Sequence, residues 1–237
     1  MLKKYSKPNK KMQKKQFQNT VLLLLLVVTS SISAQQVYIG MGLGSASFNE
    51  YENSAGENTL SNTDYNNSEE PFFEGGLKLK LTKRLKLDLG IQYYKYKINT
   101  AFNAGNTRVP KTYKLSYVGF KTGFTFDILQ WNKLTFQTHL HVSRDLLLSG
   151  TNRYQNVFVD LHKEKTLDRG LWNFHAGMGA AYKISDDLSA YLNYTRRKSL
   201  KEQNQDSTDG EAYSLAANTM TIGLIFTIPR YFRLWKG

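Results

Sequence analysis

One twenty-residue segment of the chain alternates apolar and polar side chains almost without interruption. The segment, GGLKLKLTKRLKLDLGIQYY, runs from Gly75 to Tyr94 and sets leucines on one face against lysines and an aspartate on the other. Successive side chains of a β-strand point to opposite faces, so this alternation predicts strands rather than helices. The leucine face could cover a protein core with the lysines in water, or contact lipid with the lysines inside.

The first 34 residues predict an export signal rather than part of the fold. Residues 1–20 carry seven lysines and no acidic residue, and residues 21–28 form an unbroken apolar run that leads into small residues ending at Ala34. A basic segment, a short apolar core and a small residue at the cleavage site are typical of secretory signal peptides. We therefore expect a signal peptide over 1–34 and a single β-barrel domain over 35–237, with an uncleaved anchor as the alternative.

The charge of the mature chain is modest. The sequence has 32 basic and 19 acidic residues, and without the seven leader lysines 25 basic and 19 acidic residues remain, a net charge of +6. Export and this weak excess argue against a nucleic-acid partner. Because the sequence contains no cysteine, disulfide scaffolds, thiol catalysis and zinc–thiolate sites are excluded.

Alternation of the same kind recurs along the chain and predicts eight strands. They are expected at residues 37–46, 75–81, 85–98, 113–127, 133–143, 171–182, 188–197 and 218–228. Their connections alternate in length. Short turns are predicted at 82–84, 129–132 and 185–187, and long polar loops at 47–71, 99–112, 144–169 and 199–213. No helical periodicity of useful length and no internal repeat follows the leader.

An all-β fold of this kind is either a sandwich or a closed barrel. Short turns at one end and long loops at the other are typical of transmembrane barrels, and the strands reach the roughly 9–11 residues needed to cross a bilayer. The polar face contains many glycines, which suit a narrow interior. Aromatic residues near strand ends predict interfacial girdles: Phe72, Phe73, Tyr93, Phe126, Trp131, Trp172, Tyr182 and Tyr194. We predict an eight-stranded antiparallel up-and-down transmembrane β-barrel, with a secreted β-sandwich as the alternative.

The export signal ending SISAQQ, the eight alternating strands, the glycine-rich first strand and the loop pattern together resemble a known family. It is the small eight-stranded outer-membrane β-barrel family, the OmpA-like and OmpX-like group of Gram-negative bacteria. The resemblance implies a monomer in the cell outer membrane with both termini in the periplasm. Family members usually end at the last strand with a terminal aromatic. Here Phe226 and Ile228 are followed by PRYFRLWKG, a departure from that pattern.

Three histidines form the first candidate site. His139 and His141 share the inward face of one predicted strand, and a guessed pairing in which residue numbers sum to about 314 brings His175 near His139. Three imidazoles could bind Zn or Cu. Hydrogen bonding within a polar plug is the alternative that we favour, so we predict no metal site and no cofactor.

His141 and Ser143 form a second candidate, because a base and a hydroxyl two residues apart could make an activated nucleophile. A family of outer-membrane lipid A deacylases uses such a pair facing lipid, whereas the alternation here turns His141 and Ser143 inward. We therefore predict no catalytic residue.

The inward face also carries charges that could mark an ion path or plug the barrel. They are Glu74, Lys78, Lys80, Lys86, Asp88, Lys121, Asp127 and Arg197. An eight-stranded barrel holds little more than its own side chains, so we expect paired charges in a closed interior. The loop at 47–71 has six acidic residues and six asparagines but no spaced calcium-loop pattern, which favours a solvated loop.

Taken together, these features predict a structural or binding protein of the outer membrane, not an enzyme. Its expected partners are membrane lipid and, through the four long loops, another envelope protein or an extracellular ligand. The alternatives are a narrow pore, a component of an envelope secretion or assembly machine, and an outer-membrane lipid hydrolase.

Overall fold

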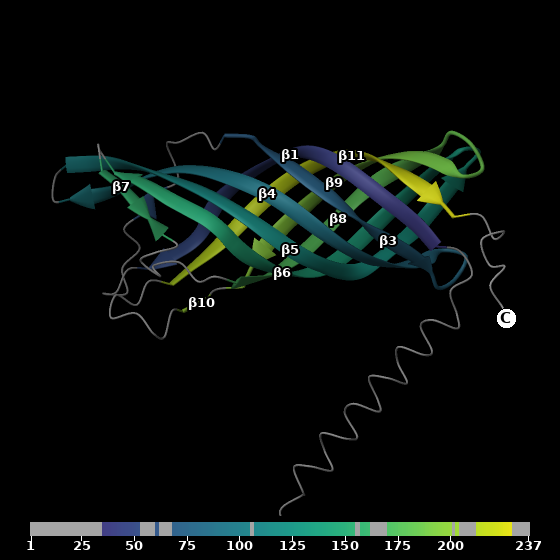
Figure 1. The fold of residues 1–237 in the computed structure, drawn as a ribbon, viewed down its shortest axis with the longest axis horizontal. Coiled ribbons are helices and arrows are strands. Elements are labelled where there is room, and N and C mark those ends of the chain that lie inside the picture. Colours follow the sequence, from purple (N-terminus) through teal and green to yellow (C-terminus); the bar gives the residue numbers. More distant parts are fainter. Residues whose placement is uncertain are drawn as a thin grey trace, which may run out of the picture. The chain divides into compact units, whose positions relative to one another are not determined.

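A computed structural model describes residues 35–52, 60–61, 68–104, 107–154, 157–161, 170–200, 202–203 and 212–228 (Figure 1). The chain divides into a unit of Met1–Ser33 and a unit of Ala34–Gly237, and every described residue belongs to the second. The predicted signal peptide and the tail after Ile228 lie outside the described residues. Among these residues no helix is long and apolar enough to span a bilayer.

Eight long strands form a closed ring. They are β1 (Gln35–Glu52), β3 (Glu70–Lys80), β4 (Leu85–Ala104), β5 (Thr107–Trp131), β6 (Leu134–Tyr154), β8 (Gly170–Lys183), β9 (Leu188–Ser199) and β11 (Ala212–Thr227). Each pairs antiparallel with its neighbours, and β1 pairs with both β3 and β11, so the sheet closes on itself. Short strands β2 (Leu60–Ser61), β7 (Val157–Asp160) and β10 (Glu202–Gln203) pair with β4, β6 and β11. The predicted eight-stranded antiparallel barrel is confirmed, and the sandwich alternative is wrong.

Three tight turns join strands at one end of the barrel, which we call the turn end. After β3, the Thr82 hydroxyl accepts hydrogen bonds from the backbone N–H groups of Arg84 and Leu85, at 3.2 and 3.0 Å. Asn132, which follows β5, has a φ of 53°, a left-handed conformation that asparagine tolerates. The three predicted short turns are therefore confirmed, although β5 runs on to Trp131 and makes the second one shorter than expected. We call the opposite end the loop end.

The strands extend much further toward the loop end than the sequence indicated. β4 and β5 pair continuously out to Ala104 and Thr107, and β5 and β6 pair out to Lys111 and Tyr154. Most of the predicted loop at 99–112 and the first part of that at 144–169 are therefore strand. Their polar residues had favoured loops, but Asn99, Thr112, Thr151 and Arg153 lie on the outward side of paired strands.

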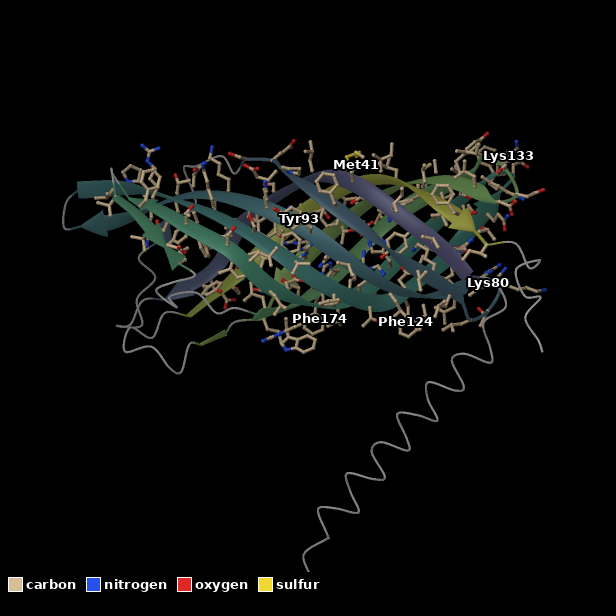
Figure 2. All side chains as sticks on the ribbon, in the orientation of Figure 1. Met41, Lys80, Tyr93, Phe124, Lys133 and Phe174 are labelled. Atoms are coloured by element: carbon tan, nitrogen blue, oxygen red, sulfur yellow. The ribbon has the colours of Figure 1, made fainter. Side chains whose placement is uncertain are left out.

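The described strands have two regions of opposite polarity. Toward the turn end, large apolar side chains point outward all around the barrel and form what we call the apolar belt; Met41, Phe124 and Phe174 point away from the wall in Figure 2. Its members include Ile39, Met41, Leu43, Phe73, Leu77, Leu89, Ile91, Phe120, Phe124, Leu140, Phe174, Met178, Leu192, Tyr194, Met220, Ile222 and Phe226, each at least 38% exposed. Such a continuous exposed band is typical of a lipid-facing surface.

Toward the loop end the apolar side chains turn inward and form what we call the loop-end core. This cluster of buried residues contains Ala46, Phe48, Phe72, Tyr94, Tyr96, Ile98, Tyr113, Leu115, Tyr117, Leu147, Leu161, Leu171, Tyr213, Leu215 and Ala217. Phe72, predicted as a girdle residue, belongs to this core and is 3% exposed. The prediction placed both Phe72 and Phe73 in the girdle, but only one of two adjacent strand residues can face outward, and that residue is Phe73.

Candidate functional site

Polar side chains fill the barrel behind the apolar belt, and we call them the lumen network. Its buried members include Lys78, Asp88, Gln92, Lys121, Thr125, Gln137, His139, His141, Ser143, Asp145, Asn173, His175, Arg197, Thr219 and Thr221. They come from seven strands, because inward positions alternate with belt positions along each strand. Buried polar groups of this kind must satisfy one another.

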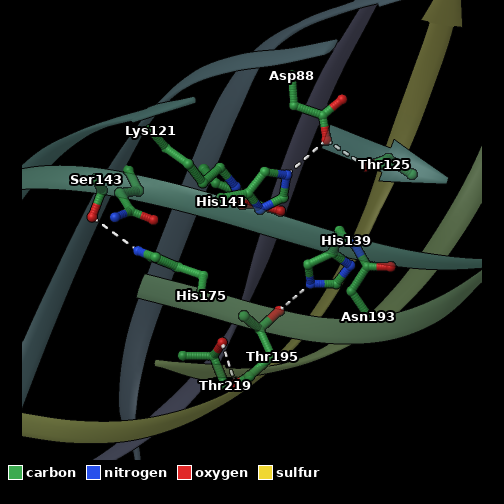
Figure 3. A network of polar contacts seen from close by, with 12 residues as sticks. Asp88, Lys121, Thr125, His139, His141, Ser143, His175, Asn193, Thr195 and Thr219 are labelled. Carbon is green, nitrogen blue, oxygen red and sulfur yellow. Dashed lines mark hydrogen bonds and ion pairs between the residues drawn. The ribbon is translucent and has the colours of Figure 1, made fainter. Parts of the chain in front are cut away.

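Asp88 on β4 lies at the centre of the turn-end half of the network. Its carboxylate accepts hydrogen bonds from Lys78 Nζ at 2.9 Å and from the Thr125 hydroxyl at 2.5 Å, and the same oxygen lies 2.9 Å from His141 Nε2 (Figure 3). Close by, the Lys121 ammonium is paired with the Glu74 carboxylate. The buried cations on β3 and β5 are therefore matched by acids on β4 and β3.

Most of the predicted inward charges therefore pair inside the barrel. Lys86 and Asp127, nearer the turn end, are 2.8 Å apart. Lys80 is an exception: it is exposed at the last position of β3, so its placement in the lumen was wrong. The barrel mouth opens there, and an inward strand position no longer guarantees burial.

Asp145 on β6 organises the other half of the network. It is fully buried and accepts hydrogen bonds from Gln92 Nε2 at 3.1 Å and from Tyr94 and Asn173. The Arg197 guanidinium lies 3.9 Å from this carboxylate and donates to the Tyr96 hydroxyl at 2.8 Å. Sequence reasoning missed Asp145 because position 145 fell inside a predicted loop.

The three histidines do meet inside the barrel, but each has a different partner. The rings of His139 and His141 stack with centroids 5.1 Å apart, and His175 pairs opposite His141 rather than His139. His139 hydrogen-bonds to Thr195 at 2.8 Å and His175 to Ser143 at 2.9 Å (Figure 3). Within the described part of the chain no group of three His, Asp or Glu side chains could hold a metal ion. The histidines serve as hydrogen-bonding members of the network.

The predicted β6–β8 register was wrong by two. Paired residue numbers sum to 316, as in His141 with His175, rather than 314. A shift of two keeps every side chain on its face, because the period of a strand is two. Hence the inward direction of His141 and Ser143 was right, although His175 pairs opposite His141 and not opposite His139. Ser143 is 1% exposed and bonds to His175, so it does not face lipid.

Little space remains inside the lumen network. Inward glycines make room for neighbouring side chains: a Cβ on Gly177 would collide with the His139 imidazole, and one on Gly119 with the Asp145 carboxylate. The cavity left between the side chains has a volume of about 20 Å³. That is room for about one water molecule, not for a continuous aqueous path.

A second site lies on the outer side of the strands beyond the apolar belt. A cavity of about 300 Å³, which we call the hairpin pocket, is lined by Lys97, Asn99, Thr112, Lys114, Thr151, Arg153 and Phe158. Three of these side chains are cationic and none is acidic. They come from β4, β5, β6 and β7, and the strand pairing explains how they meet.

Two rows of directly paired residues build the hairpin pocket. Lys97 pairs with Lys114, which pairs with Thr151. The second row brings Thr112 beside Asn99, with a hydrogen bond of 3.1 Å, and sets the Arg153 guanidinium 5.2 Å from the Phe158 ring. The sequence did not predict this pocket, because most of its residues fell in segments assigned to loops.

Outer-membrane proteins are among the solved structures to which the chain is similar. Neisserial surface protein A (NspA) is 9% identical with a TM-score of 0.49, over 82% of this chain and 97% of that chain. Ail, the attachment invasion locus protein of Yersinia pestis, is 9% identical with a TM-score of 0.40, over 81% and 98%. The outer membrane protease OmpT from Escherichia coli is 8% identical with a TM-score of 0.44, over 84% and 98%. No curated protein matches the sequence.

A protein-family model matches most of the chain. The model is described as outer membrane protein beta-barrel domain, and the match covers residues 20–225. It therefore includes all eight strands of the ring, except for the last two residues of β11. The chain belongs to the outer-membrane β-barrel domain family and is a β-barrel protein of the outer membrane.

Proposed function

We propose that this protein is a monomeric, non-catalytic and non-conducting barrel that binds an anionic ligand at its loop end, outside the cell. The turn end and both termini face the periplasm. Outer-membrane barrels have short periplasmic turns and longer outer connections, and this supports the orientation. The apolar belt includes members on every strand of the ring, which suits a single barrel surrounded by lipid.

The observation that carries this proposal is the continuation of the wall beyond the belt. From Tyr94 to Ala104, β4 remains paired with β5 and extends about 30 Å along its own axis. The loop-end core packs behind this part of the wall, with Ile98 and Tyr117 fully buried. A binding surface built on packed strands loses less conformational entropy on binding than one built on loops.

The hairpin pocket gives this surface a chemical preference. Lys97, Lys114 and Arg153 line the pocket together with Phe158. Lysine and arginine donors bind carboxylate, sulfate or phosphate groups, and an aromatic ring adds contact with an apolar or sugar face. An anionic glycan combines these properties and is the ligand class that we expect.

The lumen network argues against transport. Its cavity of about 20 Å³ is enclosed by paired charges such as Lys78 with Asp88, and moving a hydrated ion through it would require breaking those pairs. The same enclosure supports a non-catalytic role, because Ser143 and His175 lie behind the strands, where a substrate has no room to bind.

Binding of dextran sulfate by the refolded protein tests the proposal, with neutral dextran as the comparison. We expect the protein to bind dextran sulfate saturably and not to bind neutral dextran. A K97E/K114E/R153E variant should bind dextran sulfate with at least tenfold lower affinity. The matched control is K83E/R84E/K133E, which makes the same charge change at the exposed turn end. Equal loss in both variants, or no binding by the unmodified protein, would contradict the proposal. Planar-bilayer recordings should stay silent, and discrete conductance steps would contradict the closed lumen.

A further inference from the structure

We propose that the outer wall over β5, β6, β8 and β9 binds lipid A, the phosphorylated and acylated glycolipid of the outer leaflet. The acyl chains lie in a groove of the apolar belt, and a phosphate contacts cations at its loop end. This inference shares the orientation of the barrel with the proposed function but not its ligand or its pocket.

The groove has a volume of about 640 Å³. Its apolar walls include Phe124, Leu140 and Phe174, and Ala176 lies on the same outward face. Phe124 pairs with Leu140, Leu140 with Ala176, and Ala176 with Arg196, so these outward side chains form one row across four strands. The short side chain of Ala176 leaves space between its larger neighbours, and lipid is the solvent that must fill it.

Two cations close the groove at one end only. Arg196 and Lys198 on β9 line it and are both exposed. They follow Leu192 and Tyr194 on the same outward face, so the strand changes from apolar to cationic toward the loop end. Given the rise and tilt of barrel strands, Arg196 lies about 20 Å above Leu188, close to the expected edge of a roughly 25 Å apolar band. The cations thus stand at headgroup height and the apolar walls at acyl-chain height.

A third cation lies beside this upper end. Arg144 on β6 pairs opposite Trp172 on β8, and its guanidinium lies 5.4 Å from the Trp172 ring. Trp172 is two positions from Phe174 on the same outward face. An interfacial aromatic that supports an arginine is suited to a phosphate headgroup, because arginine and tryptophan both remain favourable at this depth.

The cations are restricted to one side of the barrel. Strands β1 and β11 carry no Lys or Arg along their described length, and Ser45, Ser47 and Asn218 occupy outward positions toward their loop ends. A general attraction to anionic headgroups would favour cations all around the belt. Arg144, Arg196 and Lys198 therefore form a local group beside the groove, separate from Lys95 and Lys114 on β4 and β5, which lie outside it.

Arg196 and Lys198 are weakly engaged within the protein. Arg196 has no ion-pair or hydrogen-bond partner among the residues described, and Lys198 Nζ is 3.9 Å from the Glu50 carboxylate in a pair whose side chains are 59% and 49% exposed. Exposed pairs at this distance contribute little. A phosphate offers Arg196 a bidentate contact and competes readily with Glu50 for Lys198.

Native mass spectrometry of the folded barrel in detergent, with added hexa-acyl lipid A, tests the proposal. We expect one lipid A to remain bound, with at least tenfold weaker retention of the dephosphorylated lipid and of phosphatidylglycerol. Equal retention of phosphatidylglycerol, or no retained lipid A, would overturn the proposal. Both comparisons use the unmodified protein, so they hold even if a variant fails to fold.

Two variants locate the site. R196Q/K198Q should retain lipid A at least tenfold more weakly than the unmodified protein. Ala176→Trp, which fills the groove without changing its charge, should weaken retention by a similar factor. The control K83Q/K133Q removes two exposed cations at the turn end, outside both the groove and the hairpin pocket. Heat-modifiable gel migration establishes that each variant is folded. Loss of lipid A in the control, or its retention in both groove variants, would overturn the proposal.

Discussion

Both ends of strand β4 alternate apolar and polar side chains, but the apolar face points outward near the turn end and inward near the loop end. Near the turn end Leu89 and Ile91 point outward while Asp88 and Gln92 are buried; beyond Tyr94 the lysines point outward and Ile98 is buried. The period of two identifies a strand in both regions. Which face is apolar identifies the solvent, because lipid selects an apolar exterior and water selects an apolar interior.

The point of reversal marks the boundary between the two solvents. On β4 it falls at Tyr93 and Tyr94, and on β5 at Tyr117 and Val118, where the inward residue is aromatic on both strands. Arg197 and Asp145 lie just behind this boundary, with Arg197 4.1 Å from the Tyr94 ring. The charged network and the aromatic core therefore meet at one level, and changes on either side of it should have different consequences.

Asp145→Ala should have the largest effect, because Asp145 connects the two regions. Its removal leaves Arg197 buried with no carboxylate beside it and takes an acceptor from Gln92 and Tyr94. Loss of one member of a buried ion pair costs about 3–5 kcal/mol. Urea unfolding of the barrel in lipid vesicles measures the change, and the exposed Asp186→Ala is the control, for which no change is expected. A loss below about 1 kcal/mol would show that Asp145 does not hold the two regions together.

Truncation in the loop-end core should cost nearly as much. Ile98 is fully buried, so Ile98→Ala should destabilise the barrel by about 2–5 kcal/mol, as in the core of a water-soluble protein. Ile91→Ala on the same strand should cost less, because Ile91 is 52% exposed on the belt and lipid fills the space left behind. The same urea titration compares them, and equal losses would contradict the assignment of two different solvents.

A charge on the outer face should distinguish the regions directly. Ile222→Arg places a guanidinium in the belt, where Ile222 is 61% exposed between Met41 and Leu192, and should cost about 2–4 kcal/mol. Leu148→Arg, at an outward position 51% exposed on the loop-end part of β6, should change stability by no more than about 0.5 kcal/mol. Similar losses of stability at both positions would show that the membrane extends further toward the loop end than the belt indicates.

The smallest effect is expected at the turn end. A hydrogen bond of 2.6 Å from the Lys183 ammonium, together with its charge, holds the pKa of Asp186 below its ordinary value of 3.8. A lowered pKa in the folded state gives stability that is present above the unfolded pKa and is lost as the pH falls through the folded one. Because the pair is exposed, Lys183→Ala should raise the pKa of Asp186 toward 3.8 in an NMR titration without a measurable change in unfolding. An unshifted pKa would contradict the bond.

The strand segments within the apolar belt could be predicted from the sequence, whereas their extensions beyond the belt could not, and the reason is physical. From Leu85 to Tyr94 the apolar residues mark an outward face, and the predicted strand, its phase and its inward charges are confirmed. The predicted strand ended at Ile98, because the segment that follows is rich in Asn and Thr, which also populate loops, so the paired strand from Asn99 onward was taken for a connection. The sequence did contain one signal of the continued strand: at Tyr93 and Tyr94 the apolar residues change from the outward to the inward positions.

The candidate sites were predictable only in part. The inward direction of His139, His141 and Ser143 follows from alternation alone. The partner of each residue depends on the register of β6 and β8, which a long connection does not fix. The hairpin pocket and Asp145 depend on strand extensions that no local pattern distinguishes from polar loops.

The pairing of β1 with β11 imposes an order on assembly. Every other contact between long neighbouring strands joins segments consecutive in the chain, whereas this seam, from Gln36 with Thr227 to Glu52 with Ala212, joins the first strand to the last. Until it forms, two edges of unpaired backbone N–H and C=O groups face outward, which hydrocarbon does not tolerate. Biogenesis must therefore shield the nascent edges until the final strand arrives, and a chain that stops before Ala212 has no stable state within a bilayer.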